Sequence, residues 1–318
     1  MRVLVTGAAG FVGRALCPAL AAAGHEVIAG VREGTAPPGA HAHRTLGDLA
    51  EERSLDAAVA GVDAVVHLAA RAHMMRETAA DPLILYRRVN VDGTRRLAEA
   101  AARADVRRFV LMSSVKVNGE RTSMRPFTED DPPAPADAYG ISKREAEETL
   151  AAIASKMGLS AVALRTPLVY GPGVRANFLA LLRLCDSPWP LPFGGVSGNR
   201  RSLIHLANLV DAIAVALVHP SANGIYLVSD GEDLSTAGMI RRLRAALGRP
   251  TRLLPLPARL LETSLRLLGR GALADRLCGS LAVDTGRIAR NLGWRPPITV
   301  DEGLAATVAW YRQAVRGA

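Results

Sequence analysis

In the first half of the chain, short apolar runs alternate with longer stretches in which apolar residues recur every three or four positions. A short run that is apolar throughout is typical of a strand buried in a parallel sheet, and the longer spacing is typical of a helix. Strands that alternate with helices predict a doubly wound α/β fold. The predicted strands are residues 2–6, 26–31, 63–70, 108–114 and 159–165, with a further strand ending at 47–49, and the predicted helices are 14–23, 51–60, 83–103 and 139–157.

The second half contains more helices than strands and predicts a smaller C-terminal α/β domain that holds the substrate. We expect the two domains to interleave, with residues 1–166 and about 200–219 in the first, and residues 167–199 and 220–318 in the second. The strand near 202–206 should therefore return to the parallel sheet. The predicted helices are 177–184, 207–218, 234–247, 284–292 and 300–315, and the predicted strands are 202–205 and 224–229.

Residues 255–283 combine the apolar spacing of a helix with arginines at 259, 266, 270 and 276. This pattern occurs in helices that lie on a membrane surface. It occurs more often in a pair of helices that packs over a cleft, and we prefer this interpretation. Arg276 is then placed to reach a phosphate of the substrate.

A glycine-rich turn joins the first predicted strand to the first predicted helix. Gly7 permits the tight turn, Gly10 lets the backbone approach a pyrophosphate, and Gly13 allows the helix to pack closely on the strand. The N-terminus of the helix, where Phe11 and Val12 lie, favours the negative charge of the phosphates. The order strand, glycine turn, helix, strand predicts a Rossmann-type dinucleotide-binding domain.

Residues at the ends of three strands bear on which dinucleotide is bound. Arg32 suits a ribose 2′-phosphate and favours NADP(H), whereas the adjacent Glu33 could hold a ribose hydroxyl, so that NAD(H) stays open. After the third strand, Asp48 is placed to bond an adenine amine, and Leu49 follows it. The residues at the end of the fourth strand that suit close passage of the cofactor are Leu68, Ala69 and Ala70.

Tyr139 and Lys143 stand four residues apart at the start of a predicted helix, after a proline-rich stretch. Residues at this spacing lie on one face of a helix. We expect the ammonium of Lys143 to lower the pKa of the Tyr139 phenol, ordinarily near ~10, so that the phenol can exchange protons near neutrality. Ser114, at the end of the fifth strand, is placed to hydrogen-bond a substrate oxygen beside Tyr139.

The composition excludes several classes of protein. The 318 residues carry a net charge of +9, but the chain has no nucleic-acid module, no basic tail and few aromatic residues to stack on bases. No apolar run approaches the roughly 18 residues of a membrane span, and the N-terminus has no signal-peptide pattern. The three scattered Cys fit a reducing cytoplasm, and neither they nor His67 and His73 have the spacing of a metal site. We therefore expect a cytoplasmic protein without metal or nucleic acid.

Eight short segments carry motifs that occur together: residues 6–13, 47–49, 67–70, 90–94, 113–114, 139–143, 165–172 and 201–205. With them, nearly the whole chain resembles the extended short-chain dehydrogenases/reductases of the NAD-dependent epimerase/dehydratase type. The resemblance implies that Ser114, Tyr139 and Lys143 form a catalytic triad. It also implies that Lys143 bonds the nicotinamide ribose, that Asn90 supports the cofactor site, and that a homodimer forms through the helices at 83–103 and 139–157.

By the same resemblance the substrate is a nucleotide sugar, and we expect a UDP-sugar. Adjacent arginines, Arg200 and Arg201, suit a diphosphate because guanidinium groups form bidentate, charge-assisted bonds. Trp189 and Phe193 either form walls for the uracil or sugar or simply pack the small domain, and Met74 with Met75 borders the substrate. The residues expected to contact substrate are Ser114, Lys116, Asn177, Phe178, Arg201 and Arg276.

Departures from the family pattern narrow the implied activity. The 4,6-dehydratases have two acidic residues after the position of Ser114, where this chain has Val115 and Lys116, so we do not expect a dehydratase. The epimerases usually have Asn at the position of Leu168. The run 113–120 is most similar to the subgroup that includes UDP-4-keto-6-deoxy-N-acetylhexosamine 4-reductases of surface-polysaccharide biosynthesis.

We therefore expect an NADPH-dependent reductase that acts on C4 of a UDP-4-keto-hexose or hexosamine. The close alternative is a UDP-glucose or UDP-N-acetylglucosamine 4-epimerase with retained NAD, in which the same triad works in both directions within one turnover. A non-catalytic NADP-sensing scaffold is an alternative of another class, and it predicts that Tyr139→Phe leaves function intact.

Overall fold

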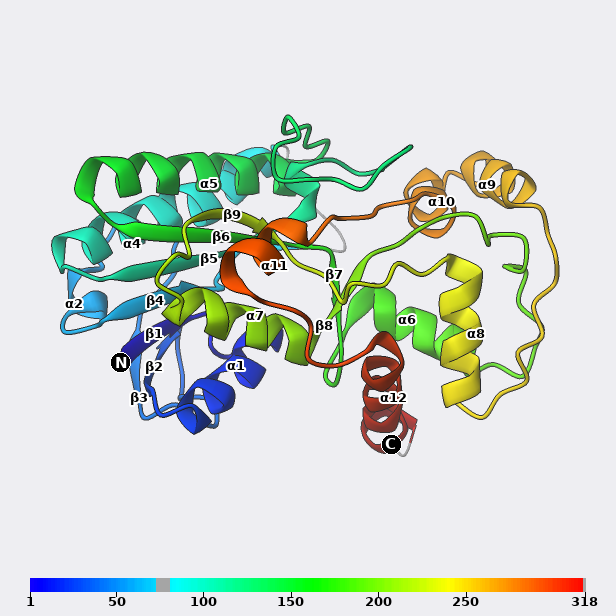
Figure 1. Cartoon of the computed structure of the whole chain (residues 1–318), viewed down its shortest axis with the longest axis horizontal. Helices are drawn as coiled ribbons and strands as arrows, with labels where there is room; N and C mark the ends of the chain where they lie inside the picture. Colours follow the sequence, from blue (N-terminus) through cyan, green and yellow to red (C-terminus); the bar gives the residue numbers. More distant parts are fainter. Residues whose placement is uncertain (73–80, 317–318) are drawn as a thin grey trace.

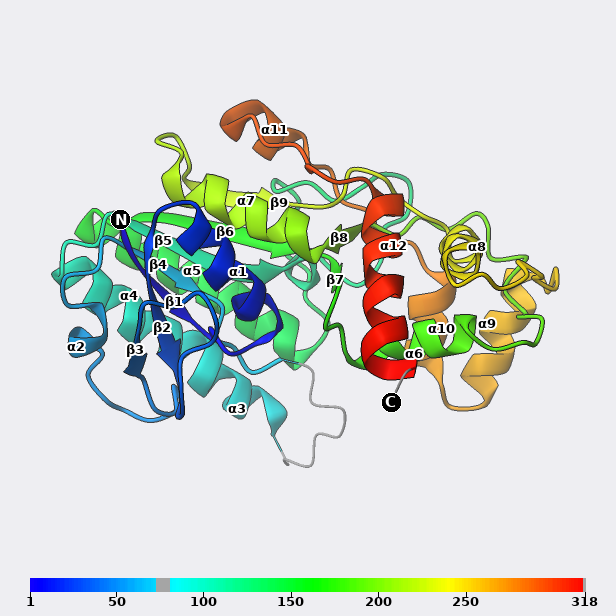
Figure 2. The ribbon, with the colours of Figure 1, turned by 90° about the horizontal axis from the view of Figure 1, so that it is seen from below.

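The computed structural model describes residues 1–72 and 81–316 and consists of a larger part built on a sheet and a smaller, mainly helical part (Figure 1). The predicted positions of His73, Met74 and Met75 lie outside the described residues. Figure 2 shows α12 (Val300–Tyr311) at the side of the smaller part that faces the sheet.

A seven-stranded sheet forms the centre of the larger part. Its strands follow the order β3-β2-β1-β4-β5-β6-β9, and every neighbouring pair is parallel. The central strands are buried on both faces, which explains their uninterrupted apolar runs. The predicted doubly wound α/β fold is confirmed. The strands are β1 (Arg2–Thr6), β2 (Glu26–Val31), β3 (Ala42–Thr45), β4 (Ala64–His67), β5 (Arg108–Ser114), β6 (Ser160–Thr166) and β9 (Gly224–Leu227).

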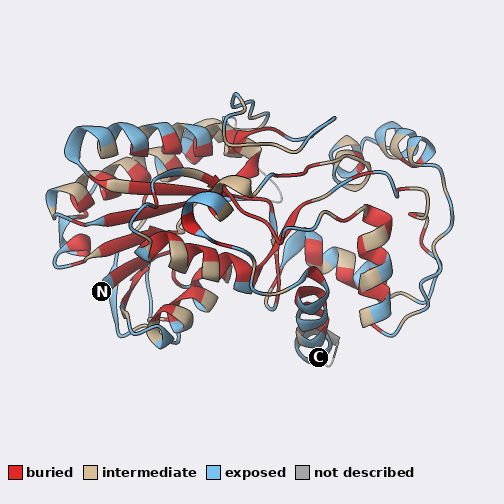
Figure 3. Ribbon diagram, in the orientation of Figure 1, coloured by how far each residue is buried: buried red, intermediate tan, exposed pale blue. Residues whose placement is uncertain are grey.

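Helices cover both faces of this sheet. On one face, α1 and α7 pack their apolar residues against the strands, and on the other face α2, α4 and α5 do so. Figure 3 shows the exposed residues of these helices turned away from the sheet. Helix α4 packs against α5, so the two helices through which a homodimer is predicted lie together, and that assembly stays a prediction. The helices are α1 (Phe11–Ala22), α2 (Asp56–Val59), α4 (Gly93–Arg103), α5 (Ala138–Met157) and α7 (Leu206–Val218).

The predicted helix 83–103 is interrupted by one wider turn. It begins as α3 (Pro82–Arg87), passes through a π-helical turn at Arg88–Asp92, and continues as α4. Such turns are frequent at functional sites. This one contains the buried Asn90, whose side chain bonds to two other segments of the chain, as described below.

The prediction that the strand near 202–206 returns to the main sheet is wrong. Strand β8 (Leu203–His205) pairs with β7 (Leu168–Tyr170) in a separate two-stranded sheet, and β9 is the last strand of the main sheet. Pro167 stands between β6 and β7, and because proline has no N–H to donate, it marks the point where the chain leaves the main ladder. The division into two domains stays a proposal, now with β9 in the cofactor domain.

The smaller part has its own apolar core around Tyr170, Phe178 and Phe193. Phe193 is buried there, whereas Trp189 is 73% exposed, so Phe193 packs the core and does not wall a substrate. Residues 255–283 form a helical pair, as preferred from the sequence. The helices of this part are α6 (Ala176–Cys185), α8 (Thr236–Ala246), α9 (Ala258–Leu267), α10 (Gly271–Cys278) and α12, while α11 (Gly286–Leu292) packs toward the main sheet.

Candidate active site

A cleft of about 280 Å³ opens at the carboxyl ends of β1, β2 and β4. Ligands of open parallel sheets bind at this edge, near the point where the strand order reverses, which here lies between β1 and β4. We call it the cofactor cleft. Most of the residues predicted to bind a dinucleotide line it, namely Gly7, Gly10, Arg32, Asp48, Leu49, Leu68, Ala69 and Ala70.

The glycine turn beneath this cleft has no room for side chains. Gly7 has a positive φ of +67°, and a Cβ there would lie 2.8 Å from the backbone nitrogen of Ala69. A Cβ on Gly13 would lie 2.5 Å from the carbonyl oxygen of Gly7, so only glycine allows α1 to start so close to β1. Phe11 opens α1, and its N-cap Gly10 offers no side-chain acceptor to the first N–H groups. These N–H groups and this narrow turn fit a pyrophosphate.

The adenosine end of the cleft carries two candidate recognition residues. Arg32 is exposed at the end of β2, and Asp48 lies after β3, where its Oδ1 accepts a hydrogen bond of 2.8 Å from the backbone N–H of Ala50. Both residues line the cleft. The sequence places them correctly because each closely follows a strand of the Rossmann sheet.

Ser114 and Tyr139 meet at the end of β5. Ser114 is the last residue of β5 and is 8% exposed, and Tyr139 lies in the first turn of α5, which is capped by Asp137. Gly140 lets this turn approach the segment after β5, because a Cβ there would lie 2.9 Å from the carbonyl oxygen of Lys116. Burial raises the pKa of the Tyr139 phenol to about 12, while a hydrogen bond with Ser114 acts in the opposite direction.

Lys143 lies one helical turn after Tyr139, as predicted, but its ammonium has a different partner. Its Nζ donates a hydrogen bond of 2.7 Å to the carbonyl oxygen of Met112 on β5. Burial lowers the pKa of Lys143 to about 8, and the negative charge of Glu147 acts to raise it. The expected lowering of the Tyr139 pKa by Lys143 is therefore wrong for this state of the protein, because desolvation dominates the titration of both groups.

A buried ionic network lies directly behind Lys143, and the sequence analysis missed it. The carboxylate of Glu147 pairs with Arg165 at 2.7 Å and also accepts a hydrogen bond from Ser113. Arg165 donates in turn to Asn118 at 3.0 Å. Glu147 stands four residues after Lys143, so it lies on the same helix face, and this spacing is the signal that could have found it.

Asn90 joins the catalytic helix to the segment after β4. Its Nδ2 donates to Ser142 at 2.9 Å, and its Oδ1 accepts from the backbone N–H of Arg71 at 2.8 Å. The guanidinium of Arg71 lies 5.5 Å from the centre of the Tyr86 ring, and Tyr86 meets Tyr139 edge to face. Asn90 is thus placed to support the site by fixing α5 against the loop beside the cofactor cleft.

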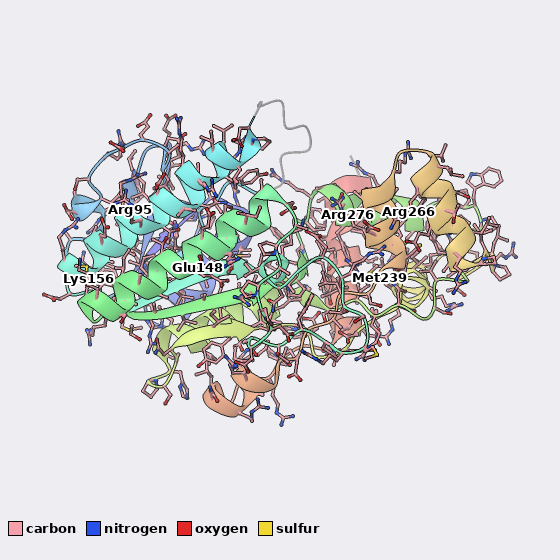
Figure 4. All side chains as sticks on the ribbon, turned by 90° about the horizontal axis from the view of Figure 1, so that it is seen from above. Arg95, Glu148, Lys156, Met239, Arg266 and Arg276 are labelled. Carbon is pink, nitrogen blue, oxygen red and sulfur yellow. The ribbon has the colours of Figure 1, made fainter. Side chains whose placement is uncertain are left out.

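The predicted substrate residues divide into two groups. Arg201 donates a hydrogen bond of 3.3 Å to the carbonyl oxygen of Gly279, which directly follows α10, the helix that carries Arg276. Burial above all, and then the positive charge of Arg276, lower the pKa of Arg201. Glu120 and Arg121 also act on Arg201, and we call these four residues the arginine mouth. Figure 4 shows where Arg276 lies on the smaller part. Cations gathered in this way suit a diphosphate.

Two further basic residues near the site are held by ion pairs. Lys116 is held by ion pairs with Asp137 and Glu120, and Arg200 pairs with Asp233 at 2.8 Å. Of the two adjacent arginines, only Arg201 therefore belongs to the mouth.

The two residues of α6 that we expected to contact the substrate differ in their exposure. Asn177 is exposed in the first turn of the helix. Phe178 is only 1% exposed and stacks on Tyr170, so its ring supports the core and is not available to a substrate. The expected role of Phe178 is therefore wrong, because its ring faces the apolar core of the smaller part.

Two buried histidines lie near the site but keep ordinary structural partners. His67 Nδ1 is 2.6 Å from the hydroxyl of Thr6, and burial lowers its pKa to about 3. His205 caps α7, and burial lowers its pKa to about 4. Both are neutral at physiological pH. Within residues 1–72 and 81–316, no three His, Cys, Asp or Glu side chains are grouped so that they could hold a metal ion.

Comparisons with known proteins agree with this geometry. The model of the NAD dependent epimerase/dehydratase family matches residues 3–229. A UDP-glucose 4-epimerase of Vibrio cholerae is 42% identical over 314 residues, which cover 98% of this chain and 96% of that protein. The structure of MoeE5 in complex with UDP-glucuronic acid and NAD matches with a TM-score of 0.78 at 28% identity, covering 99% of this chain and 100% of that one. A Thermus thermophilus UDP-glucose 4-epimerase in complex with NAD matches with a TM-score of 0.76 at 27% identity, covering 99% and 100%.

Proposed function

The chain belongs to the NAD dependent epimerase/dehydratase family, and we propose that it is a UDP-hexose 4-epimerase that works with bound NAD. The observation that carries the proposal is the meeting of Ser114, Tyr139 and Lys143 at the end of β5, the sheet edge at which the cofactor cleft also opens. The similarity to a 4-epimerase over 98% of the chain supports it. NAD is supported by the neighbouring structures that contain it.

Bound NAD would supply a reversible acceptor for the hydrogen at C4 of the sugar. Tyr139, as its phenolate, takes the proton of the C4 hydroxyl as that carbon is oxidised to a ketone, and it returns the proton after the sugar has presented its other face. The positive charge of the nicotinamide of bound NAD would favour the phenolate by acting against the burial that raises the pKa of Tyr139. Ser114 hydrogen-bonds the same oxygen in both directions. Because each half-reaction reverses the other at the opposite face, the substrate is inverted at C4 with no net oxidation.

Lys143 and the diphosphate residues have supporting roles in this proposal. Lys143 lies one helical turn from Tyr139, and in this proposal its ammonium bonds the ribose of the cofactor. Arg201 and Arg276 hold the diphosphate of the substrate through charge-assisted bonds. An anchored diphosphate leaves the sugar itself free to turn over, which a 4-epimerase requires.

A second candidate is the NADPH-dependent 4-ketoreductase expected from the sequence. The specific observation in its favour is Arg32, an exposed cation that lines the adenosine end of the cofactor cleft. A guanidinium there suits a 2′-phosphate. Arg32→Ser should weaken NADPH binding strongly if the protein is a reductase, and it should leave an NAD-dependent epimerase nearly unchanged.

Cofactor accounting tests the two candidates against each other. The purified protein is incubated with UDP-galactose, and separately with UDP-N-acetylgalactosamine, while the absorbance of reduced nicotinamide is followed and the nucleotide sugars are separated by chromatography. The epimerase predicts conversion to the C4 epimer without a net change in absorbance. Consumption of NADPH in equal amount to a UDP-4-keto-sugar, with no epimerisation, would establish the reductase instead.

A further inference from the structure

The helical pair α9 and α10 exposes a large apolar surface at the end of the molecule opposite the main sheet (Figure 1). Leu260 is 54% exposed, Leu267 84% and Leu268 72%. Single exposed leucines are common in soluble proteins, but exposed leucines gathered on one short element mark an interaction surface.

Two of the exposed leucines share one side of α9. Leu260 and Leu267 are seven residues apart and therefore lie one above the other, while Leu261 and Leu265 face the protein. Arg259 and Arg266 are likewise seven residues apart, so they form a second stripe next to that of the leucines. The helix thus has an apolar stripe toward solvent with a basic stripe along its border.

A neighbouring segment adds to this surface. Residues 187–196 run beside 252–257 and are joined to them by backbone hydrogen bonds, such as that from the Leu254 N–H to the carbonyl oxygen of Leu191. Leu254 is 52% exposed and precedes α9, and Trp189 lies two residues before Leu191. Tryptophan and leucine are residues that enter the boundary between lipid headgroups and acyl chains.

The net charge of this surface is positive because its arginines outnumber its acidic residues. Glu262 and Asp275 pair with Arg121 and Arg266, which ties the helical pair to the segment after the catalytic serine. Arg259 and Arg270 are exposed, and neither is ion-paired with a carboxylate of the described residues. Their charges are therefore available to an external partner.

We propose that this face, made of Trp189, Leu254, Leu260, Leu267, Arg259 and Arg270, docks on the surface of an anionic membrane. The leucines enter the headgroup region while the arginines pair with lipid phosphates. The contact is peripheral, since none of the helices in the described part of the chain has the length and apolar character needed to cross a bilayer. The inference does not depend on which C4 reaction the enzyme catalyses.

The charge of the face argues against a second copy of the chain as its partner. A two-fold contact joins the same surface of both copies, so it would bring the unpaired Arg259 and Arg270 of one copy toward those of the other, and like charges brought together oppose association. An anionic bilayer has the opposite charge and accepts the leucines as well. Docking there would hold the arginine mouth, which includes Arg276 of α10, close to the membrane surface.

Vesicle binding of the full chain tests the proposal. Sedimentation with vesicles of phosphatidylcholine alone and of phosphatidylcholine with phosphatidylglycerol should show binding only to the anionic vesicles, weakening as salt is raised. The double variant Leu260→Ser/Leu267→Ser should bind about tenfold more weakly, and Arg259→Gln/Arg270→Gln should lose most binding at low salt. Both should keep wild-type turnover of soluble UDP-sugar, because neither pair touches the active site.

A matched control uses residues away from this face. Val218 is 55% exposed at the end of α7, and Arg183 is exposed on α6, so Val218→Ser/Arg183→Gln removes one apolar group and one charge elsewhere. This variant should bind vesicles like the wild type. Equal binding of all variants, or no preference for anionic vesicles, would overturn the proposal. It would equally fail if the leucine variant changed the sedimentation coefficient without lipid, because the face would then join two copies.

Discussion

The cofactor cleft and the arginine mouth are built in opposite ways. The cleft is formed mainly by backbone and by residues too small to obstruct it, such as Gly7 and Ala69. The mouth is formed by long charged side chains, of which Arg201 and Arg276 come from segments far apart in the sequence. A narrow backbone surface selects by shape and long cations select by charge, which would suit a fixed cofactor and a sugar that must move.

The largest effect on turnover is expected from a substitution of Tyr139. Tyr139→Phe removes the proton-transfer group and should lower kcat by about 1,000-fold, within the range for loss of a general acid–base group. The KM for UDP-sugar and the affinity for NAD should stay within about twofold, because neither region loses a contact. Steady-state kinetics and calorimetric titration check this. An unchanged kcat would show that Tyr139 is not the proton-transfer group, and an absence of turnover in both the variant and the wild type would support a non-catalytic scaffold.

A change to the cleft should act on cofactor binding alone. Gly13→Ala places a Cβ 2.5 Å from the carbonyl oxygen of Gly7, so the turn must shift, and we expect NAD affinity to fall by about 100-fold. Gly198→Ala is the matched control, since nothing lies within 4 Å of its added Cβ. Titration with NAD and with UDP measures both. Unchanged NAD affinity in Gly13→Ala would contradict the role given to the turn.

Loss of a charge from the arginine mouth should weaken substrate binding and leave cofactor binding unchanged. Arg201→Ala removes a charge-assisted bond to the diphosphate and should raise the KM for UDP-sugar by about 10- to 100-fold, with NAD binding unchanged. Arg200→Ala tests the position rather than the charge, because Arg200 is paired with Asp233 and its loss should change KM less than about twofold. Equal effects of the two substitutions would show that Arg201 does not hold the substrate specifically.

The smallest predicted effect concerns pH. Burial lowers the pKa of Lys143 from 10.5 to about 8, so its ammonium is lost as pH rises through that value, and kcat should fall several-fold between about pH 7.5 and 9. A loss of folding stability cannot cause this fall in kcat. Between about pH 8 and 10.5, Lys143 is protonated in the unfolded chain but not in the folded one, so its contribution to the free energy of unfolding rises with pH. Lys143→Arg keeps the charge and should move the fall to higher pH. A profile identical to that of the wild type would exclude Lys143 as its origin.

The residues that could be predicted from the sequence are those whose position follows from the local order of strands and helices. Gly7, Gly10, Arg32 and Asp48 each closely follow a strand, so that local order alone places them in one cleft. The triad was also accessible, since helical spacing relates Tyr139 to Lys143 and strand ends share one edge of the sheet.

Residues whose role depends on tertiary contacts were placed less well. Phe178 was expected at the substrate but stacks on Tyr170, and β8 was expected in the main sheet but pairs with β7. Neither contact has a local sequence signal. The titration of Tyr139 was likewise misjudged, because spacing gives the distance to Lys143 but not the burial that sets both pKa values.

The central claim is that the hydrogen at C4 leaves the sugar and returns to the same carbon without exchanging with water. UDP-galactose labelled with deuterium at C4 is converted by the purified protein in ordinary water, and the product is examined by mass spectrometry and NMR. We expect UDP-glucose that keeps its deuterium at C4, with no net change in the redox state of the nicotinamide. Product without deuterium, or no UDP-glucose at all while NADPH is consumed by a 4-keto-sugar, would contradict it.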